Sequence, residues 1–195
     1  MSLVDAGPFL SVSKYVDFDD PAVAAKAAAL AHSASSRTEI ARRCFEFVRD
    51  EIKHSVDFML GPITCKASDV LRHGTGFCYA KSHLLAALLR ANGLPAGLCY
   101  QRLSIGEQGA PYCLHGLNAV YLDGYGWYRI DARGNKPGIN AAFTPPAEAL
   151  AFAVRPPTEH DFPQILPNPL PCVVETLEAH TTIEEMLRHL PDVAA

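Results

Sequence analysis

Residues 74–95, with the sequence GTGFCYAKSHLLAALLRANGLP, decide the fold of this chain. Behind a glycine-rich entry, leucines recur with the spacing of one apolar face of an α-helix, at Leu84, Leu85, Leu88 and Leu89. Gly93 and Pro95 then end the helix, because glycine adopts the left-handed C-terminal conformation and proline cannot continue the hydrogen-bond ladder. The stretch therefore predicts a helix that begins near Cys78 and packs its leucines into a core.

Helical segments come before this stretch and strands come after it. Asp20 and Pro21 are suited to the N-cap and first position of a helix over 21–33. Ser36-Arg37-Thr38-Glu39 predicts a capping box for a second helix that runs to about Lys53. Beyond the central helix the pattern becomes that of strands, over 96–104, 115–122 and 127–132. This order indicates an α+β fold, with N-terminal helices packed on an antiparallel sheet.

Proline is concentrated in the last quarter of the chain, with eight prolines among the 27 residues of 145–171. Such a composition favours an extended, stiff segment. Thr182-Ile183-Glu184-Glu185 then predicts a capping box for a last short helix that ends before Pro191. We therefore expect one domain over 1–144 and a Pro-rich C-terminal extension over 145–195 that wraps the same domain.

The composition fits a globular protein without nucleic-acid or membrane partners. Of 195 residues, 49% are hydrophobic, and 17 Lys and Arg stand against 21 Asp and Glu, for a net charge of −4. A nucleic-acid partner requires a basic face, and the longest apolar helical stretch, Leu84–Leu89, is too short to span a bilayer. The N-terminus lacks the features of a secretory signal, and six cysteines are too few for a disulfide framework. We therefore expect reduced thiols and a cytoplasmic protein.

Cys78 is the candidate nucleophile because of its place at the start of the central helix. Unpaired N–H groups and the positive end of the helix dipole favour a thiolate over a thiol there, and a nearby histidine strengthens the effect. The glycines before it let a substrate backbone come close and leave the N–H of Cys78 available to an oxyanion. A buried, inert thiol is the more frequent role of a free cysteine, and we assign it to Cys44, Cys65, Cys99 and Cys172.

A thiol nucleophile requires a base, and the base requires an acceptor that orients it. His115 begins a predicted strand and Asp131 ends the next one. The two side chains share a face of the hairpin only if the loop has an odd number of residues, for instance Gly124-Tyr125-Gly126. A two-residue Asp123-Gly124 turn would place them on opposite faces, and the sequence permits both turns. Singly, His115 fits a strand-start histidine and Asp131 a loop acceptor, but with Cys78 they form a Cys-His-Asp constellation.

Other residues near this constellation have weaker signals. Tyr79 and Trp127 are candidates to line a substrate cleft, although aromatic residues at this spacing more often pack in a core. Arg133-Gly134-Asn135 directly follows Asp131, and we interpret it as a chain turn rather than as a binding site for a substrate carboxylate. The sequence gives no signal for the second donor of an oxyanion hole.

Three segments of the chain resemble the transglutaminase-like superfamily. They are GTGFCYAKSHLLAALLRANGLPAGLCYQRL around Cys78, HGLNAVYL at His115 and GWYRIDARGN at Asp131, and the resemblance covers about residues 37–135. The chain is most similar to small bacterial members described as cysteine proteases. The resemblance implies a papain-like core in which Cys78 attacks an amide or ester carbonyl, His115 transfers the proton and Asp131 fixes the imidazole tautomer.

The activity that this resemblance implies is thiol-dependent hydrolysis of an amide (peptide-like) bond through an acyl-enzyme. The substrate would be peptide-like, or a small amide or ester. The chain departs from its relatives at Leu117, where the family often has Trp two residues after the histidine. Tyr79-Ala80 also replace the Gly-Ser that follows the nucleophile in papain itself. Because no calcium loop of the EF-hand type is present, we expect neither a metal nor another cofactor.

Three other functions compete with hydrolysis. Transfer of the acyl group to an amine, as by a transamidase or an arylamine N-acetyltransferase, uses the same three residues. A non-catalytic interaction module on this fold would ordinarily have lost Cys78, His115 or Asp131, and all three are present. A metal site at Cys113-Leu114-His115 lacks the paired short spacings of structural zinc sites. The sequence indicates no oligomeric state.

Overall fold

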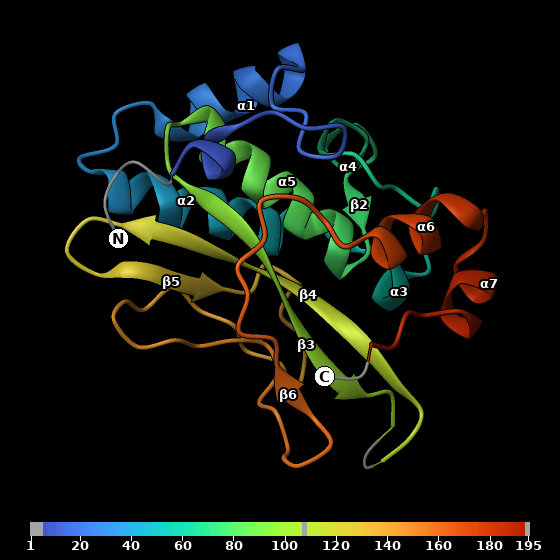
Figure 1. The fold of residues 1–195 in the computed structure, drawn as a ribbon. Helices are drawn as coiled ribbons and strands as arrows, with labels where there is room; N and C mark the ends of the chain where they lie inside the picture. The colour runs from blue at the N-terminus through green and yellow to red at the C-terminus, as the bar shows by residue number, and fades with distance from the viewer. Residues whose placement is uncertain (1–5, 107–108, 194–195) are drawn as a thin grey trace.

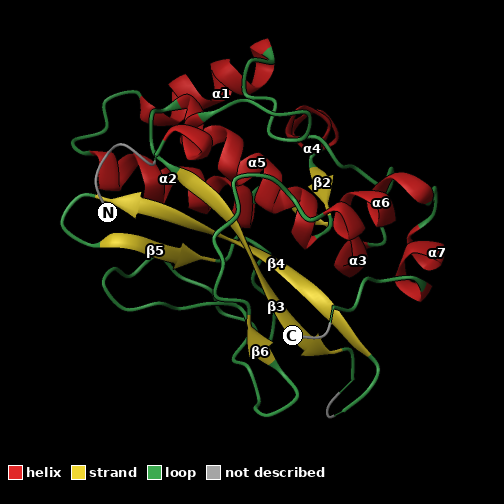
Figure 2. Cartoon of the chain, in the orientation of Figure 1, coloured by secondary structure: helices red, strands yellow, loops and turns green. Residues whose placement is uncertain are grey.

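The computed structural model describes residues 6–106 and 109–193 (Figure 1, Figure 2). Its helices are α1 (Pro21–Ala31), α2 (Arg37–Asp50), α3 (Ser55–Phe58), α4 (Ala67–His73), α5 (Cys78–Ala91), α6 (Pro171–Ala179) and α7 (Ile183–Arg188), with a 3-10 turn over Gly7–Leu10. Its strands are β1 (Lys53–His54), β2 (Thr75–Gly76), β3 (Ala96–Ser104), β4 (Tyr112–Leu122), β5 (Gly126–Ile130) and β6 (His160–Asp161).

An antiparallel sheet and a layer of helices make up the body of the molecule. The strands lie in the order β5-β4-β3-β6, and β3 pairs with β4 from Ala96↔Val120 to Ser104↔Tyr112. The helices α1, α2, α4 and α5 lie on one side of this sheet (Figure 1). The short strands β1 and β2 form a separate parallel pair beside the start of α5. The predicted α+β class, with N-terminal helices on an antiparallel sheet, is confirmed.

Helix α5 is the centre of the fold. It packs on β3 and β4, and α1, α2 and α4 contact its other sides. As a result every residue from Cys78 to Arg90 is buried, which exceeds the single apolar face that the leucine spacing predicts. Gly93 follows the end of α5 with a φ of +71°, a backbone conformation that side chains other than glycine rarely adopt.

The two faces of β4 have different partners, because alternate residues of a strand point to opposite sides of the sheet. Gly116 and Asn118 face α5: the backbone of Gly116 packs against Tyr79, and the Asn118 amide donates to the carbonyl of Ser82 at 2.9 Å. On the opposite face, a second apolar cluster forms from Cys99, Leu117 and Ala119, with Trp127, Leu150 and Ile165 packed against it.

The first part of the Pro-rich extension covers this opposite face of the sheet, where Leu150 and Ile165 pack against the second cluster. Its strand β6 pairs with β3 at Gln101↔Asp161, and a further bridge joins Leu98 to Leu166. Buried Arg90, on α5, fastens the extension to the core by donating to the carbonyl of Pro167 at 2.6 Å. Residues 145–166 therefore pack on the sheet, through the pairing with β3 and through Leu150 and Ile165.

The helix caps lie where the sequence predicts them. The Asp20 carboxylate accepts from two N–H groups of the first turn of α1, and the Ser36 hydroxyl accepts from the N–H of Glu39. Helix α2 ends at Asp50, earlier than predicted, because the chain turns there into strand β1. The strands β1, β2 and β6 and the helices α3 and α6 were not predicted from the sequence. None of the helices in the described residues has the length and apolarity that crossing a membrane requires.

Candidate active site

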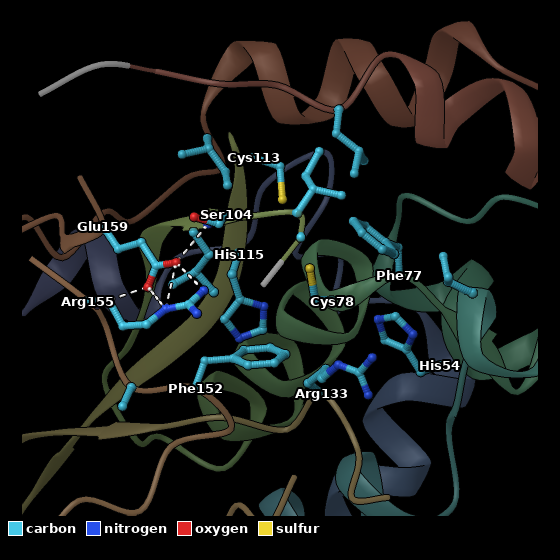
Figure 3. Close-up of a pocket in the computed structure, with 17 residues that line it drawn as sticks. His54, Phe77, Cys78, Ser104, Cys113, His115, Arg133, Phe152, Arg155 and Glu159 are labelled. Atoms are coloured by element: carbon cyan, nitrogen blue, oxygen red, sulfur yellow. Dashed lines mark hydrogen bonds and ion pairs between the residues drawn. The ribbon is translucent and has the colours of Figure 1, made fainter. Parts of the chain in front are cut away.

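A cavity of about 400 Å³ opens where the first turn of α5 meets β4 (Figure 3). Its walls come from four parts of the chain that lie far apart in the sequence. They are the region of β1 and α3, the start of α5, the end of the β3–β4 hairpin, and the chain that follows β5. The lining residues are His54, Val56, Phe77, Cys78, Leu103, Ser104, Ile105, Gly106, Cys113, Leu114, His115, Arg133, Phe152, Ala153, Arg155, Glu159 and Leu190.

Cys78 is the first residue of α5 and lies in the wall of this cavity with 3% of its surface exposed. The first helical hydrogen bond of α5 runs from the N–H of Lys81 to the carbonyl of Phe77, so the preceding N–H groups have no partner within the helix. Together with the helix dipole, these groups create a positive environment that stabilises negative charge on the sulfur or on a bound oxyanion.

The hairpin between β4 and β5 places His115 and Asp131 on the same face. The strands pair from Asn118↔Ile130 to Leu122↔Gly126, which leaves a three-residue loop of Asp123, Gly124 and Tyr125. The loop has the odd length that the prediction requires, although it begins one residue earlier than the Gly124-Tyr125-Gly126 loop considered. Gly126 has a φ of +78°, the left-handed conformation expected there. The Nε2 atom of His115 lies 2.8 Å from Oδ2 of Asp131.

Asp131 is fully buried, and three hydrogen bonds hold its carboxylate. Besides His115, the N–H of Arg133 donates to Oδ1 at 3.1 Å and the N–H of Ala151 donates to Oδ2 at 3.0 Å. Burial favours the neutral acid, but the charge of His115 and these donors outweigh it and lower the pKa of Asp131. A fixed carboxylate of this kind orients the imidazole and stabilises its protonated form.

His115 faces Cys78 across the cavity (Figure 3). The ring of Phe152 packs edge-on against the imidazole, with ring centroids 4.9 Å apart, and restricts its rotation. Burial lowers the pKa of His115, but the charge and hydrogen bond of Asp131, together with the Cys78 side chain, raise it to about 10. Since Nε2 is engaged by Asp131, Nδ1 is the ring nitrogen available to the thiol. The raised pKa favours the imidazolium form of His115 at neutral pH, in the wall that also contains Cys78.

Gly116, the residue after His115, sets how closely α5 approaches β4. A Cβ atom at this position would lie 2.9 Å from Cδ1 and 3.2 Å from Cα of Tyr79, shorter than ordinary packing distances. The hydroxyl of Tyr79 also donates to the carbonyl of Leu114 at 2.6 Å. These contacts fix the start of α5, and with it Cys78, against the strand that carries His115.

Tyr79 and Trp127, the two residues predicted to line the cleft, are not among the residues that line this cavity. Tyr79 is fully buried against β4. Its hydroxyl donates a hydrogen bond to the carbonyl of Leu114, and its ring packs against Gly116. Trp127 lies on β5, away from the cavity, and packs edge-on against Phe9 at 4.9 Å. Both aromatic residues pack against other parts of the fold, which is the more frequent role of aromatic residues at this spacing.

The sequence analysis missed several residues of the cavity wall. Neither His54 nor Phe152 has a recognisable motif around it. The β1–β2 pair places His54 at the site, and the Pro-rich extension places Phe152 there. Arg133 is part of a turn, as predicted, since its N–H binds Asp131, but its guanidinium also lines the cavity and pairs with Asp57. Its place directly after Asp131 was the one signal available in the sequence.

The cavity is mostly apolar, and its charged groups are paired. Arg133 forms two hydrogen bonds with the carboxylate of Asp57, and Arg155 forms an ion pair with Glu159. Burial opposes charge on Asp57, but Arg133 and Lys136 lower its pKa to about 2. Among the residues that the structure describes, no group of three or more His, Cys, Asp or Glu side chains is arranged to hold a metal ion.

The structure thus combines a thiol at a helix N-terminus with a histidine–carboxylate pair on an antiparallel sheet. The chain belongs to the Transglutaminase-like superfamily, whose family model matches residues 24–132. Members of this superfamily are typically Cys-His-Asp thiol enzymes. The matched segment contains all three residues of the predicted constellation.

Solved structures share the fold at low sequence identity. One is a "Putative Cysteine Protease from Cytophaga hutchinsonii", with a TM-score of 0.52 and 20% identity over 68% of this chain and 45% of that chain. Another is the periplasmic domain of TgpA from Pseudomonas aeruginosa, with a TM-score of 0.51 and 20% identity over 68% of this chain and 48% of that one. The match thus spans less than half of each of these two chains. No curated protein matches the chain by sequence. The predicted transglutaminase-like fold is confirmed.

Proposed function

We propose that this protein is a thiol hydrolase that cleaves amide bonds through an acyl-enzyme intermediate on Cys78. The observation that carries this proposal is the buried 2.8 Å contact of Asp131 with His115, which lines the same cavity as Cys78. Membership of a superfamily of thiol enzymes supports it. A purely structural histidine–aspartate pair would not require a thiol at a helix N-terminus beside it.

The proposed reaction uses the three residues in sequence. The Cys78 thiolate attacks the carbonyl carbon, and the carbon–oxygen π electrons move to the oxygen, which accepts a hydrogen bond from the N–H of Cys78. The tetrahedral intermediate collapses as the C–N bond breaks, and the leaving amine takes a proton from the His115 imidazolium. Water, deprotonated by His115, then attacks the thioester carbonyl carbon, the C–S bond breaks, and the acid leaves with Cys78 returned to the thiolate and His115 to the imidazolium. Asp131 keeps the imidazole oriented throughout.

The cavity wall favours an uncharged acyl group with an apolar side chain. Leu103, Ile105, Leu114 and Leu190 contribute apolar surface, and both cavity arginines are already paired with carboxylates. A substrate carboxylate would have to break one of these ion pairs. We therefore propose peptide-like amides, or small amides and esters, with apolar acyl groups.

Covalent capture tests this function directly. Wild-type protein and Cys78→Ala are incubated with 4-nitrophenyl butyrate and with apolar acyl-peptide 4-nitroanilides, and intact mass and chromophore release are followed. We expect a butyryl adduct on Cys78 and turnover in the wild type only. Added glycinamide separates the two fates of the acyl-enzyme: butyryl-glycinamide would indicate transfer, while free butyrate indicates hydrolysis. A wild type that forms no adduct with any of these compounds would contradict the proposal.

A further inference from the structure

A second imidazole, that of His54, lies in the cavity on the side of Cys78 opposite His115 (Figure 3). It is placed there by the parallel pairing of β1 with β2, in which His54 pairs with Gly76, two residues before Cys78. Its ring packs against Phe77 with centroids 5.2 Å apart, and only 5% of its surface is exposed. The ring is therefore fixed beside the thiol, and the proposed reaction as described so far does not use it.

The ring nitrogens of His54 form no hydrogen bond within the part of the chain that the structure describes. Its Nδ1 atom is buried without a hydrogen bond, and the nearest carboxylate oxygen, Oδ2 of Asp57, is 3.6 Å away. Both oxygens of Asp57 are already bound by Arg133, and Lys136 binds one of them as well. The Nε2 atom, which likewise has no partner there, is the ring nitrogen open to the cavity. A buried ring nitrogen without a hydrogen bond requires an explanation, and a role in binding or catalysis is one such explanation.

The surroundings of His54 keep its ring neutral. Burial and the positive charges of Arg133, Lys81 and His115 lower its pKa well below the usual range, and the opposing effect of Asp57 is smaller. A neutral imidazole carries one N–H proton. The carboxylate of Asp57 near Nδ1 favours a proton on Nδ1, although Arg133 and Lys136 also bind it, whereas an anion that forms beside Nε2 favours the tautomer with its proton on Nε2.

We propose that His54 is the second donor of the oxyanion hole and binds the substrate oxygen through Nε2–H, beside the backbone N–H of Cys78. This inference rests on the proposed function, since it assumes that Cys78 attacks a carbonyl. Cys78 lies between the two imidazoles, so a carbonyl oxygen that points away from the base His115 points toward His54. In the attack the S–C bond forms and the carbonyl π pair becomes the oxyanion. His54 keeps its proton, which distinguishes its role from the proton transfer by His115.

The test compares two reactions of the same thiol in the full chain. Acylation by 4-nitrophenyl butyrate passes through an oxyanion, whereas alkylation by iodoacetamide displaces iodide and forms none. For His54→Ala we expect acylation of Cys78 to fall about 10²–10³-fold, the loss that accompanies removal of one oxyanion donor, while alkylation changes less than about threefold. His54→Gln, whose amide can still donate, should restore part of the acylation rate. His73→Ala, a change of an exposed histidine outside the cavity, should leave both rates unchanged.

Three results would overturn the proposal. Acylation that is unchanged in His54→Ala would remove the role altogether. Equal losses of acylation and alkylation would show that His54 supports the thiolate or the fold instead. A wild type whose Cys78 alkylates rapidly but never acylates would contradict the proposed function itself, and the oxyanion role with it, and so distinguishes the two failures.

Discussion

His115 is subject to two opposing effects, and their balance defines the chemistry of the cavity. Burial disfavours the imidazolium, while the buried charge of Asp131 and the Cys78 side chain favour it and raise the pKa of His115 to about 10. The ion pair of His115 and Asp131 is therefore a feature of the fold itself and does not depend on a substrate. A histidine that is protonated at neutral pH can hold a thiolate and later supply the proton that a leaving amine needs.

Removing the charge of Asp131 should lower the pKa of His115. In Asp131→Asn we expect the ring to titrate well below its wild-type value, and catalytic turnover to fall by up to about 10⁴-fold, the loss that this change causes in a Ser-His-Asp triad. Cys78→Ala should lower the pKa of His115 by less, because Asp131 makes the larger favourable contribution. An NMR titration of the ring in the three proteins measures this order. Equal pKa values in wild type and Asp131→Asn would contradict the account.

The same raised pKa makes stability depend on pH. The folded-state pKa of His115 lies above its unfolded value of about 6.5, so its stabilising contribution is fully present below pH 6.5 and is lost as pH rises toward 10. Over this pH range the free energy of unfolding should fall in both proteins. The fall should be larger in the wild type than in Asp131→Asn, by at most about 5 kcal/mol. Urea unfolding of both proteins at pH 6, 8 and 10 measures it. The comparison between variants cancels the buried cysteines, which titrate in both. Parallel curves for the two proteins would contradict this assignment.

At the scale of elements, the contact between α5 and β4 determines whether Cys78 reaches His115. Gly116→Ala introduces a methyl group 2.9 Å from the ring of Tyr79, and overpacking of this kind costs about 1–3 kcal/mol. We expect a moderate loss of thermal stability but a much larger loss of acylation, because the start of α5 must move away from the strand. Gly7→Ala, where an added Cβ meets nothing within 4 Å, is the control. Full acylation in Gly116→Ala would show that this contact does not position the thiol.

The elements that could be predicted from the sequence are those whose signals are local. The central helix, its glycine stop, the caps at Asp20 and Ser36, and the three long strands follow from periodicity and capping, which act within a few residues. His54 could not be found in this way. Its strand has two residues and exists only because a parallel partner, β2, lies beside it, so nothing in the neighbourhood of His54 distinguishes it.

The predicted constellation Cys78, His115 and Asp131 was accessible because residue type and order carry its signal. His115 and Asp131 share a face of the hairpin only if its loop has an odd number of residues. The sequence permits an odd or an even loop, and the strand pairing shows a loop of three residues. Tyr79 shows the converse: its proximity to Cys78 in sequence suggested the cleft, but helical geometry turns it toward β4. Proximity along the chain is therefore a poor guide to which side of a helix end faces the substrate.

At the scale of the whole molecule, the Pro-rich extension completes the site from the far side of the sheet. The N–H of Ala151 binds Asp131, the ring of Phe152 packs on His115, and Arg155 and Glu159 line the cavity. The extension is thus part of the proposed active site as well as a structural layer. The cavity wall therefore includes residues of the extension.

A chain that ends at residue 144 should therefore lose both stability and thiol reactivity. The cut uncovers Leu117 and Ala119 and removes the N–H of Ala151 from the buried carboxylate of Asp131. We expect the melting temperature to fall by about 10 °C or more, with slow alkylation of Cys78. Calorimetry and peptide mass spectrometry measure the two effects. An unchanged melting temperature and rapid alkylation in the shortened chain would show that 1–144 is independent of the extension.

The central proposal is that His115 activates the thiol of Cys78, and the pH dependence of alkylation at each cysteine tests it most directly. The rates are read by peptide mass spectrometry in wild type and in His115→Gln. Burial raises the pKa of Cys44, Cys65, Cys99 and Cys113 to about 12, so these thiols serve as internal controls. We expect Cys78 to be alkylated faster than every other cysteine at pH 6. In His115→Gln this difference should be lost. Alkylation of Cys78 that is no faster than that of the buried thiols, or that is unaffected by the loss of His115, would contradict it.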